Sequence, residues 1–137
     1  MKVRDVPQDE GSCLAGNRKL NYAVDDDGHY RGVATIGWET ESAATNVGLH
    51  VTRAQIVGAW ESARAGKSSP LAYHMAVVQM DAGQLARDAG MWAWQVRRHL
   101  RADVFPTLSA ATLARYADVL GISVDELASV PVAPDLP

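Results

Sequence analysis

Alternating apolar and polar positions mark the first regular element of the chain. Leu20, Tyr22 and Val24 alternate with smaller or polar residues, and a second segment covers residues 31–37. Between them, Asp27-Gly28 supplies a turn that accepts positive φ. This combination is typical of a β-hairpin. Because an isolated hairpin is marginally stable in water, we expect it to pack on another part of the chain.

A helical period replaces the alternation between Glu39 and Ala65, a segment without proline. At 100° per residue, its apolar positions fall on two stripes that lie on nearly opposite sides. These stripes are Val47, Val51, Ala54 and Gly58, and Leu49, Ile56, Trp60 and Ala63. A helix that is apolar on two sides is usually buried on both. We expect one side to cover the hairpin and the other to meet the C-terminal module or a second copy of the chain.

Short helical patterns follow a boundary at residues 64–70, where Ser69 and Pro70 are expected to open the next helix as N-cap and first residue. About five short helices are predicted from there to Val130. The expected organisation is a flexible arm over residues 1–19, the hairpin and long helix over 20–67, a helical domain over 70–130 and a disordered, proline-rich tail over 131–137. The predicted fold class is α+β and mostly α.

Residues 81–100 contain the most informative pattern of the chain. Asp81 with Gln84 three residues later is a capping-box pattern that begins a helix. Gly90 supplies the backbone freedom for a tight turn, and Val96 and Leu100 anchor a second helix. Two short helices joined by a glycine-containing turn form a helix-turn-helix.

The next stretch predicts two further helices. One apolar helical face is formed by Leu113, Tyr116, Ala117 and Leu120. Gly121 is expected to end that helix, and Ser123 with Glu126 forms another capping box.

With these residues, the segment resembles the Cro/lambda-repressor type of helix-turn-helix, often called the XRE family. The resemblance lies in Leu85-Ala86, Gly90-Met91 and Val96, and in residues 106–127, which resemble the family's fourth and fifth helices. It covers about Pro70 to Val130. It implies a five-helix Cro/repressor-like module in a DNA-binding transcriptional regulator of bacterial or phage type.

The resemblance also implies which side chains meet double-stranded DNA, because the family places the second helix of the motif in the major groove. By position, the base-facing candidates are Ala93, Trp94, Gln95, Arg97 and Arg98. The candidates for phosphate contacts are Gln84, Arg87 and Arg101. Arginine to guanine is the commonest specific base contact, and glutamine can pair with adenine.

Several positions depart from the family pattern. Trp92 stands near the position of a small polar cap, Ala93 and Trp94 replace small polar readers, and His99 stands where an apolar residue is commoner. Because Trp92 and Trp94 are two residues apart, they cannot share a helical face. We expect one to be buried and the other to touch DNA or a protein. Trp38 and Trp60 are expected to be structural.

Composition restricts the possible functions further. The chain has 137 residues and a formal net charge of −3, so affinity for DNA would have to come from a local basic cluster such as Arg97, Arg98 and Arg101. A single cysteine, Cys13, cannot form an internal disulfide, which favours a reducing, cytoplasmic setting. The four histidines are scattered, so we expect no metal and no cofactor. Neither a membrane span nor a signal peptide is expected.

No catalytic motif is recognisable, and we do not expect an enzyme. The function predicted from the sequence is sequence-specific DNA binding by a homodimer, with the hairpin and long helix as the dimerisation element. The alternative is a protein-interaction module with the helix-turn-helix fold, including an antitoxin that binds a protein partner. A regulator that senses a small molecule through the hairpin-helix element is a third possibility.

Overall fold

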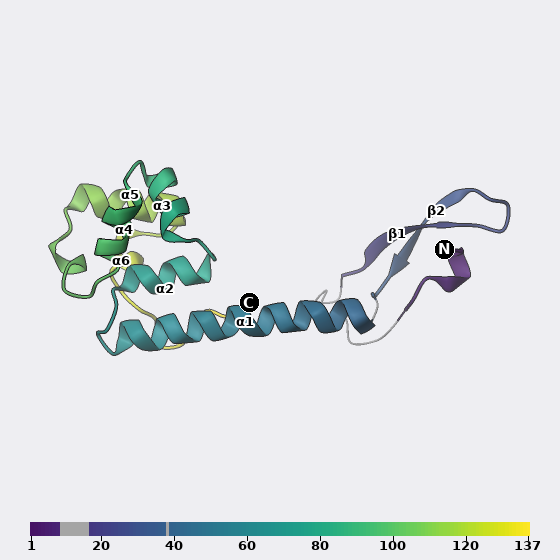
Figure 1. The fold of residues 1–137 in the computed structure, drawn as a ribbon, viewed down its shortest axis with the longest axis horizontal. Helices are drawn as coiled ribbons and strands as arrows, with labels where there is room; N and C mark the ends of the chain where they lie inside the picture. Colours follow the sequence, from purple (N-terminus) through teal and green to yellow (C-terminus); the bar gives the residue numbers. More distant parts are fainter. Residues whose placement is uncertain (9–16, 38) are drawn as a thin grey trace. The chain divides into compact units, whose positions relative to one another are not determined.

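The computed structural model describes residues 1–8, 17–37 and 39–137. Cys13, the single cysteine, and Trp38, which was expected to be structural, lie outside these ranges. The described residues form an antiparallel β-hairpin followed by six α-helices, which confirms the mostly helical α+β fold (Figure 1). They divide into two compact units, Met1–His50 and Val51–Pro137, and each unit is described separately below.

The first unit is built around the hairpin. Strand β1 (Lys19–Val24) pairs with β2 (Tyr30–Thr35) in a register that sets Lys19 opposite Thr35 and Val24 opposite Tyr30. The side chains of Leu20, Tyr22 and Tyr30 are 58%, 73% and 78% exposed. Alternation and register place these three on one face of the hairpin, so that face is apolar and open to solvent.

The N-terminal residues lie along the hairpin, where the sequence predicted a flexible arm. Lys2 bridges to Val24, Gln8 bridges to Gly37, and Val6 between them is buried beyond a short 3-10 helix, η1 (Val3–Asp5). The physical reason is that the edges of a two-stranded sheet leave backbone groups unpaired. Residues 1–8 provide partners for some of these groups.

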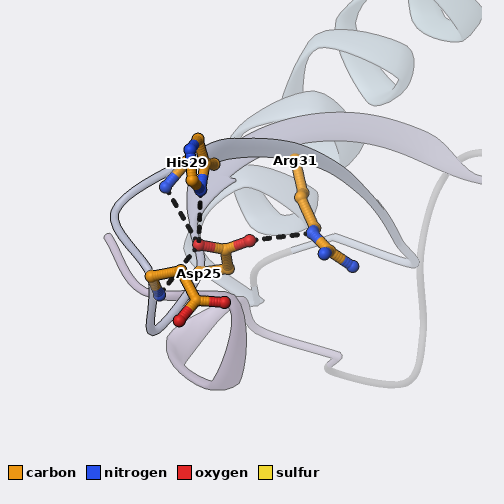
Figure 2. Close-up of polar contacts among 4 residues, drawn as sticks. Asp25, His29 and Arg31 are labelled. Atoms are coloured by element: carbon orange, nitrogen blue, oxygen red, sulfur yellow. Dashed lines mark hydrogen bonds and ion pairs between the residues drawn. The ribbon is translucent and has the colours of Figure 1, made fainter.

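The hairpin turn is organised by the carboxylate of Asp25 (Figure 2). Its Oδ1 accepts hydrogen bonds from the backbone N–H groups of Asp27 (3.0 Å) and His29 (2.9 Å). Its Oδ2 accepts from Nε of Arg31 at 2.8 Å. These contacts, led by the His29 amide, lower the pKa of Asp25 below its usual 3.8. The predicted Asp27-Gly28 turn is confirmed, with Gly28 at φ +84°.

Acidification is therefore expected to loosen this turn. Because the pKa of Asp25 is lowered by folding, its stabilising contribution is complete above pH 3.8 and is lost as the pH falls through the lower value of the folded state. The backbone amide resonances of Asp27 and His29, followed by NMR during an acid titration, should report this transition. In Asp25→Asn the transition should be absent, and an unchanged titration in that variant would contradict the assignment.

Helix α1 (Glu39–Arg64) follows the bounds expected from the sequence. In its second half, Ile56 is buried and Trp60 is half-buried, whereas Val51, Ala54 and Gly58 are exposed. Val47, in the first half, is also exposed. In the second half of α1, the stripe with Ile56 and Trp60 is therefore covered, and the stripe with Val51, Ala54 and Gly58 faces solvent.

Residues 131–137 make hydrogen bonds to α1 and α2, where the sequence predicted a disordered tail. The Pro131 carbonyl accepts from Trp60 Nε1 at 2.9 Å, and the Val132 carbonyl accepts from Arg64 Nη1 at 2.8 Å. Tyr73 Oη accepts from the Asp135 amide at 3.0 Å. Proline removes a backbone donor and leaves its carbonyl acceptor. Donor side chains of α1 can therefore bind a proline-rich segment that forms no regular structure.

The second unit holds the helices that position the candidate site. After α1 come α2 (Pro70–Val77), α3 (Ala82–Ala89), α4 (Ala93–His99), η2 (Phe105–Thr107), α5 (Ala110–Leu120) and α6 (Val124–Leu127). Their shared core consists of Leu71, Met75, Leu85, Ala86, Ala89, Val96, Phe105, Tyr116, Ala117, Leu120 and Leu127. None of the helices in the described part of the chain combines the length and apolarity needed to cross a lipid bilayer.

The predicted signals at the ends of these helices are present. Asp81 Oδ1 accepts from the Gln84 amide at 2.7 Å, and Ser123 and Glu126 form a reciprocal capping box. Gly90 and Gly121 end α3 and α5 in the left-handed conformation, at φ +67° and +69°.

The same substitution should have opposite effects at two glycines of this unit. Gly90→Ala is expected to destabilise the fold by about 1–2 kcal/mol, because its left-handed backbone disfavours any Cβ. Gly58→Ala is expected to stabilise it by about 0.5–1 kcal/mol, because a Cβ in the middle of α1 meets no atom within 4 Å. Urea denaturation of both variants measures the two changes, and shifts of the same sign would be inconsistent with this account.

Candidate nucleic-acid interface

Helices α3 and α4 form a helix-turn-helix in which the turn is fixed by local bonds. The Met91 amide donates to the Ala86 carbonyl at 2.8 Å, and Gly90 at φ +67° reverses the chain. Leu85 and Ala86 on α3 are buried together with Val96 on α4. The apolar contacts predicted for this motif are therefore confirmed, and they set which side of α4 faces outward.

The outward side of α4 carries one aromatic and two cationic side chains. Trp94, Arg97 and Arg98 are exposed and follow the spacing i, i+3, i+4, so they lie on one face of the helix. The opposite side is held by Val96, which is completely buried, with Leu100 packed against the core. The helix thus presents an indole followed by two guanidinium groups to the solvent.

Both tryptophans at the start of α4 are exposed, Trp92 by 72% and Trp94 by 61%. The expectation that one of them would be buried is wrong. The core at this end of α4 is closed instead by the smaller side chains of Met91 and Ala93, which pack against the buried cluster. Two indoles therefore flank Ala93 in solvent.

Gln95 has a structural task in addition to the predicted one. Its Oε1 accepts a hydrogen bond from the Trp92 amide at 2.9 Å, which ties the side chain to the start of its own helix. Trp92 stands at the N-cap position and has no side-chain acceptor, so Gln95 does the local capping. The amide nitrogen of Gln95 is the atom that could donate to a base.

The remaining predicted residues lie around this face in different settings. Gln84 and Arg87 are exposed on α3, three residues apart on one side. Arg101, just after α4, forms a bidentate ion pair with Asp103, with Nε–Oδ1 at 3.1 Å and Nη2–Oδ2 at 2.9 Å. Exposed pairs of this kind contribute about 0–1 kcal/mol, so a phosphate could replace the carboxylate.

Lys67 is a further basic residue near the site, and it was not among the residues predicted from the sequence. Together with Gly66, Arg101 and Asp103 it lines an open hollow of about 520 Å³. The two segments are joined by a hydrogen bond from the Ser69 amide to the Leu100 carbonyl at 2.9 Å. Lys67 lies 34 positions before Arg101, and no sequence pattern indicates that the two segments meet.

His99 closes the inner side of α4 with a polar contact. Its Nδ1 lies 2.6 Å from the hydroxyl of Tyr116 on α5. Desolvation lowers the pKa of His99, with a smaller effect from the charge of Arg98, and burial raises the pKa of Tyr116 to about 12. The hydroxyl of Tyr116 thus gives the imidazole a polar partner on this side of α4, which explains how a histidine occupies a position where an apolar residue is commoner.

Charge is distributed unevenly along the chain. Residues 81–101 include four arginines and two aspartates, whereas the whole chain has a net charge of −3. Asp81 is already engaged in capping α3, while Arg97 and Arg98 remain exposed. Residues 81–101 thus carry more arginine than aspartate, whereas the chain as a whole is acidic.

Comparison with known proteins finds no matching family model, no matching curated protein and no matching solved structure. The resemblance to the Cro/lambda-repressor type therefore rests on the residues of the motif itself. Function has to be inferred from the geometry of this site.

Proposed function

We propose that this protein is a sequence-specific DNA-binding regulator of prokaryotic or phage type. The observation that carries the proposal is the exposed face of α4, where Trp94, Arg97 and Arg98 lie opposite the buried Val96. A short helix held to a core by one side and offering arginines on the other suits insertion into the major groove. In this proposal the protein binds DNA without catalysing a reaction and without a cofactor. It would act in the cytoplasm, where the DNA is.

The proposed contacts follow from the settings of the side chains. Arg97 and Arg98 are the proposed base readers, since each guanidinium can form two parallel hydrogen bonds with guanine. We propose that the phosphates bordering the groove are bound by Gln84 and Arg87 on α3, by Arg101 after α4 and by Lys67 before α2. The arginines of residues 81–101 would then supply the positive charge for binding DNA, which the chain as a whole, at −3, does not have.

Action as a homodimer is part of the proposal. The first unit offers an apolar surface, the exposed hairpin face with Leu20, Tyr22 and Tyr30. A second copy would cover such a surface and double the number of phosphate contacts. In a two-fold complex, the two copies of α4 would address half-sites about 34 Å apart.

Fluorescence anisotropy over a salt series tests this function directly. The purified protein is titrated into the duplex from upstream of its own gene and into an unrelated duplex of equal length. We expect tighter binding to the upstream duplex, and a log–log salt slope of about −0.9 for each phosphate neutralised. Equal binding to both duplexes would remove the claim of specificity, and no binding at low salt would remove DNA as the ligand.

Exposure of both Trp92 and Trp94 favours a second candidate function, a protein-interaction module or antitoxin. Tryptophan is enriched among the side chains that dominate protein interfaces. For this second function, we expect Trp94→Ala to abolish capture of the co-expressed product of a neighbouring gene. The protein would then bind neither duplex. The anisotropy experiment therefore separates the two candidates.

A further inference from the structure

We propose that Trp94 recognises the 5-methyl groups of thymine in the major groove. This inference rests on the proposed DNA-binding function and adds a readout that the arginines do not supply. The sequence preference would then combine guanines, read by Arg97 and Arg98, with thymines placed toward the start of α4.

The position of Trp94 is fixed by the structure around it. It lies in the first turn of α4, one residue from Ala93, which packs against the core, and two residues from the buried Val96. The Trp92 amide donates to Gln95 Oε1, so the backbone that carries both indoles is tied down at the turn. Because the backbone around Trp94 is already ordered, its indole can contact DNA without the entropy cost of ordering a flexible segment.

The chemistry of indole selects what that surface can be. Indole has one N–H donor and no acceptor, and the rest of its surface is apolar. Guanine, cytosine and adenine present polar groups in the major groove, and thymine adds a methyl group there. Covering polar groups with an indole would leave hydrogen bonds unmade. Covering a methyl group removes apolar surface from water on both partners.

The neighbouring charges favour nucleic acid over a protein as the occupant of this surface. Arg97 and Arg98 share the exposed face with Trp94, and Arg87 is exposed on the adjoining helix. Nucleic acid carries a negative charge at every phosphate, so exposed guanidinium groups around an indole are complementary to it in charge. An indole beside several guanidinium groups is complementary to a ligand with apolar spots within a polyanion, and DNA is such a ligand.

Replacing thymine by uracil tests the proposal, because uracil lacks only the methyl group. A duplex selected by the protein from a random-sequence pool is synthesised once with thymine and once with uracil. Wild type is expected to bind the uracil duplex about fourfold more weakly for each contacted methyl. In Trp94→Ala the ratio of the affinities for the thymine and uracil duplexes should be at least about fourfold smaller than in wild type. Trp60→Phe, on α1, is the control and should keep the wild-type ratio.

Each outcome has a defined meaning. Equal binding of the thymine and uracil duplexes by wild type, with selection still successful, overturns the methyl readout and leaves the DNA-binding function in place. A thymine preference that persists unchanged in Trp94→Ala also overturns it. Tighter binding of the separated strand than of the duplex would assign the indoles to base stacking instead. Failure to select any duplex overturns the proposed function together with this inference.

Discussion

Alanine at Arg97 or at Arg98 is expected to weaken binding to the specific duplex by about 1–3 kcal/mol, a loss of roughly 5- to 150-fold. Both side chains are exposed on the outward face of α4, so their removal should leave the fold intact. The loss is expected because each guanidinium can satisfy two acceptors of one guanine, which no other group on this face can do. Titration of each variant with the specific and the unrelated duplex measures the change and its selectivity.

Arg64→Ala is the matched control for this prediction. It removes the same charge from the chain, but the Arg64 guanidinium is committed to α1, where it lies 5.0 Å from the Trp60 ring and donates to the Val132 carbonyl. We expect its affinity to stay near that of wild type. If both α4 variants bound as tightly as wild type, this helix could not be the element that enters the groove.

The largest expected effect on stability comes from Leu85→Ala, at about 2–5 kcal/mol. Leu85 is completely buried on α3 within the core that it shares with Val96 of α4 and Tyr116 of α5. Its truncation removes apolar contact and leaves a cavity where α3 and α4 meet. Denaturant unfolding followed by circular dichroism gives the change in the free energy of unfolding.

An exposed valine provides the comparison for this core substitution. Val78, just after α2, is 44% exposed, so Val78→Ala is expected to change stability by no more than about 0.5 kcal/mol. A small effect at Leu85, similar to that at Val78, would mean that the two helices are not held by a common core. DNA binding by Leu85→Ala should fall in parallel with the folded fraction.

Local signals in the sequence predicted the framework of the site well. The hairpin, the extent of α1, the cap at Asp81 and the turn at Gly90 all depend on residues close to one another in the chain. Such features can be read from the sequence because each follows from backbone preference or from a bond spanning a few residues. The buried positions Leu85 and Val96 were predicted from the spacing of the helix-turn-helix pattern.

Features that depend on distant residues could not be predicted in this way. Lys67 and Arg101 line one hollow because the Ser69 amide meets the Leu100 carbonyl, a contact across 31 positions. The tail over residues 131–137 is held by side chains of α1 and α2, which its own composition does not reveal. The exposure of both Trp92 and Trp94 depends on how completely Met91 and Ala93 fill the core at this point.

The attachment of α4 to its core also has an evolutionary consequence. The helix is fixed by Val96, Leu100 and the internal cap from Gln95, and the exposed positions 94, 97 and 98 contribute little to folding. Substitutions at exposed positions usually change stability by less than about 0.5 kcal/mol. Two or three codon changes at these positions could therefore give descendants of this protein a different exposed surface on α4, without passing through an unfolded ancestor.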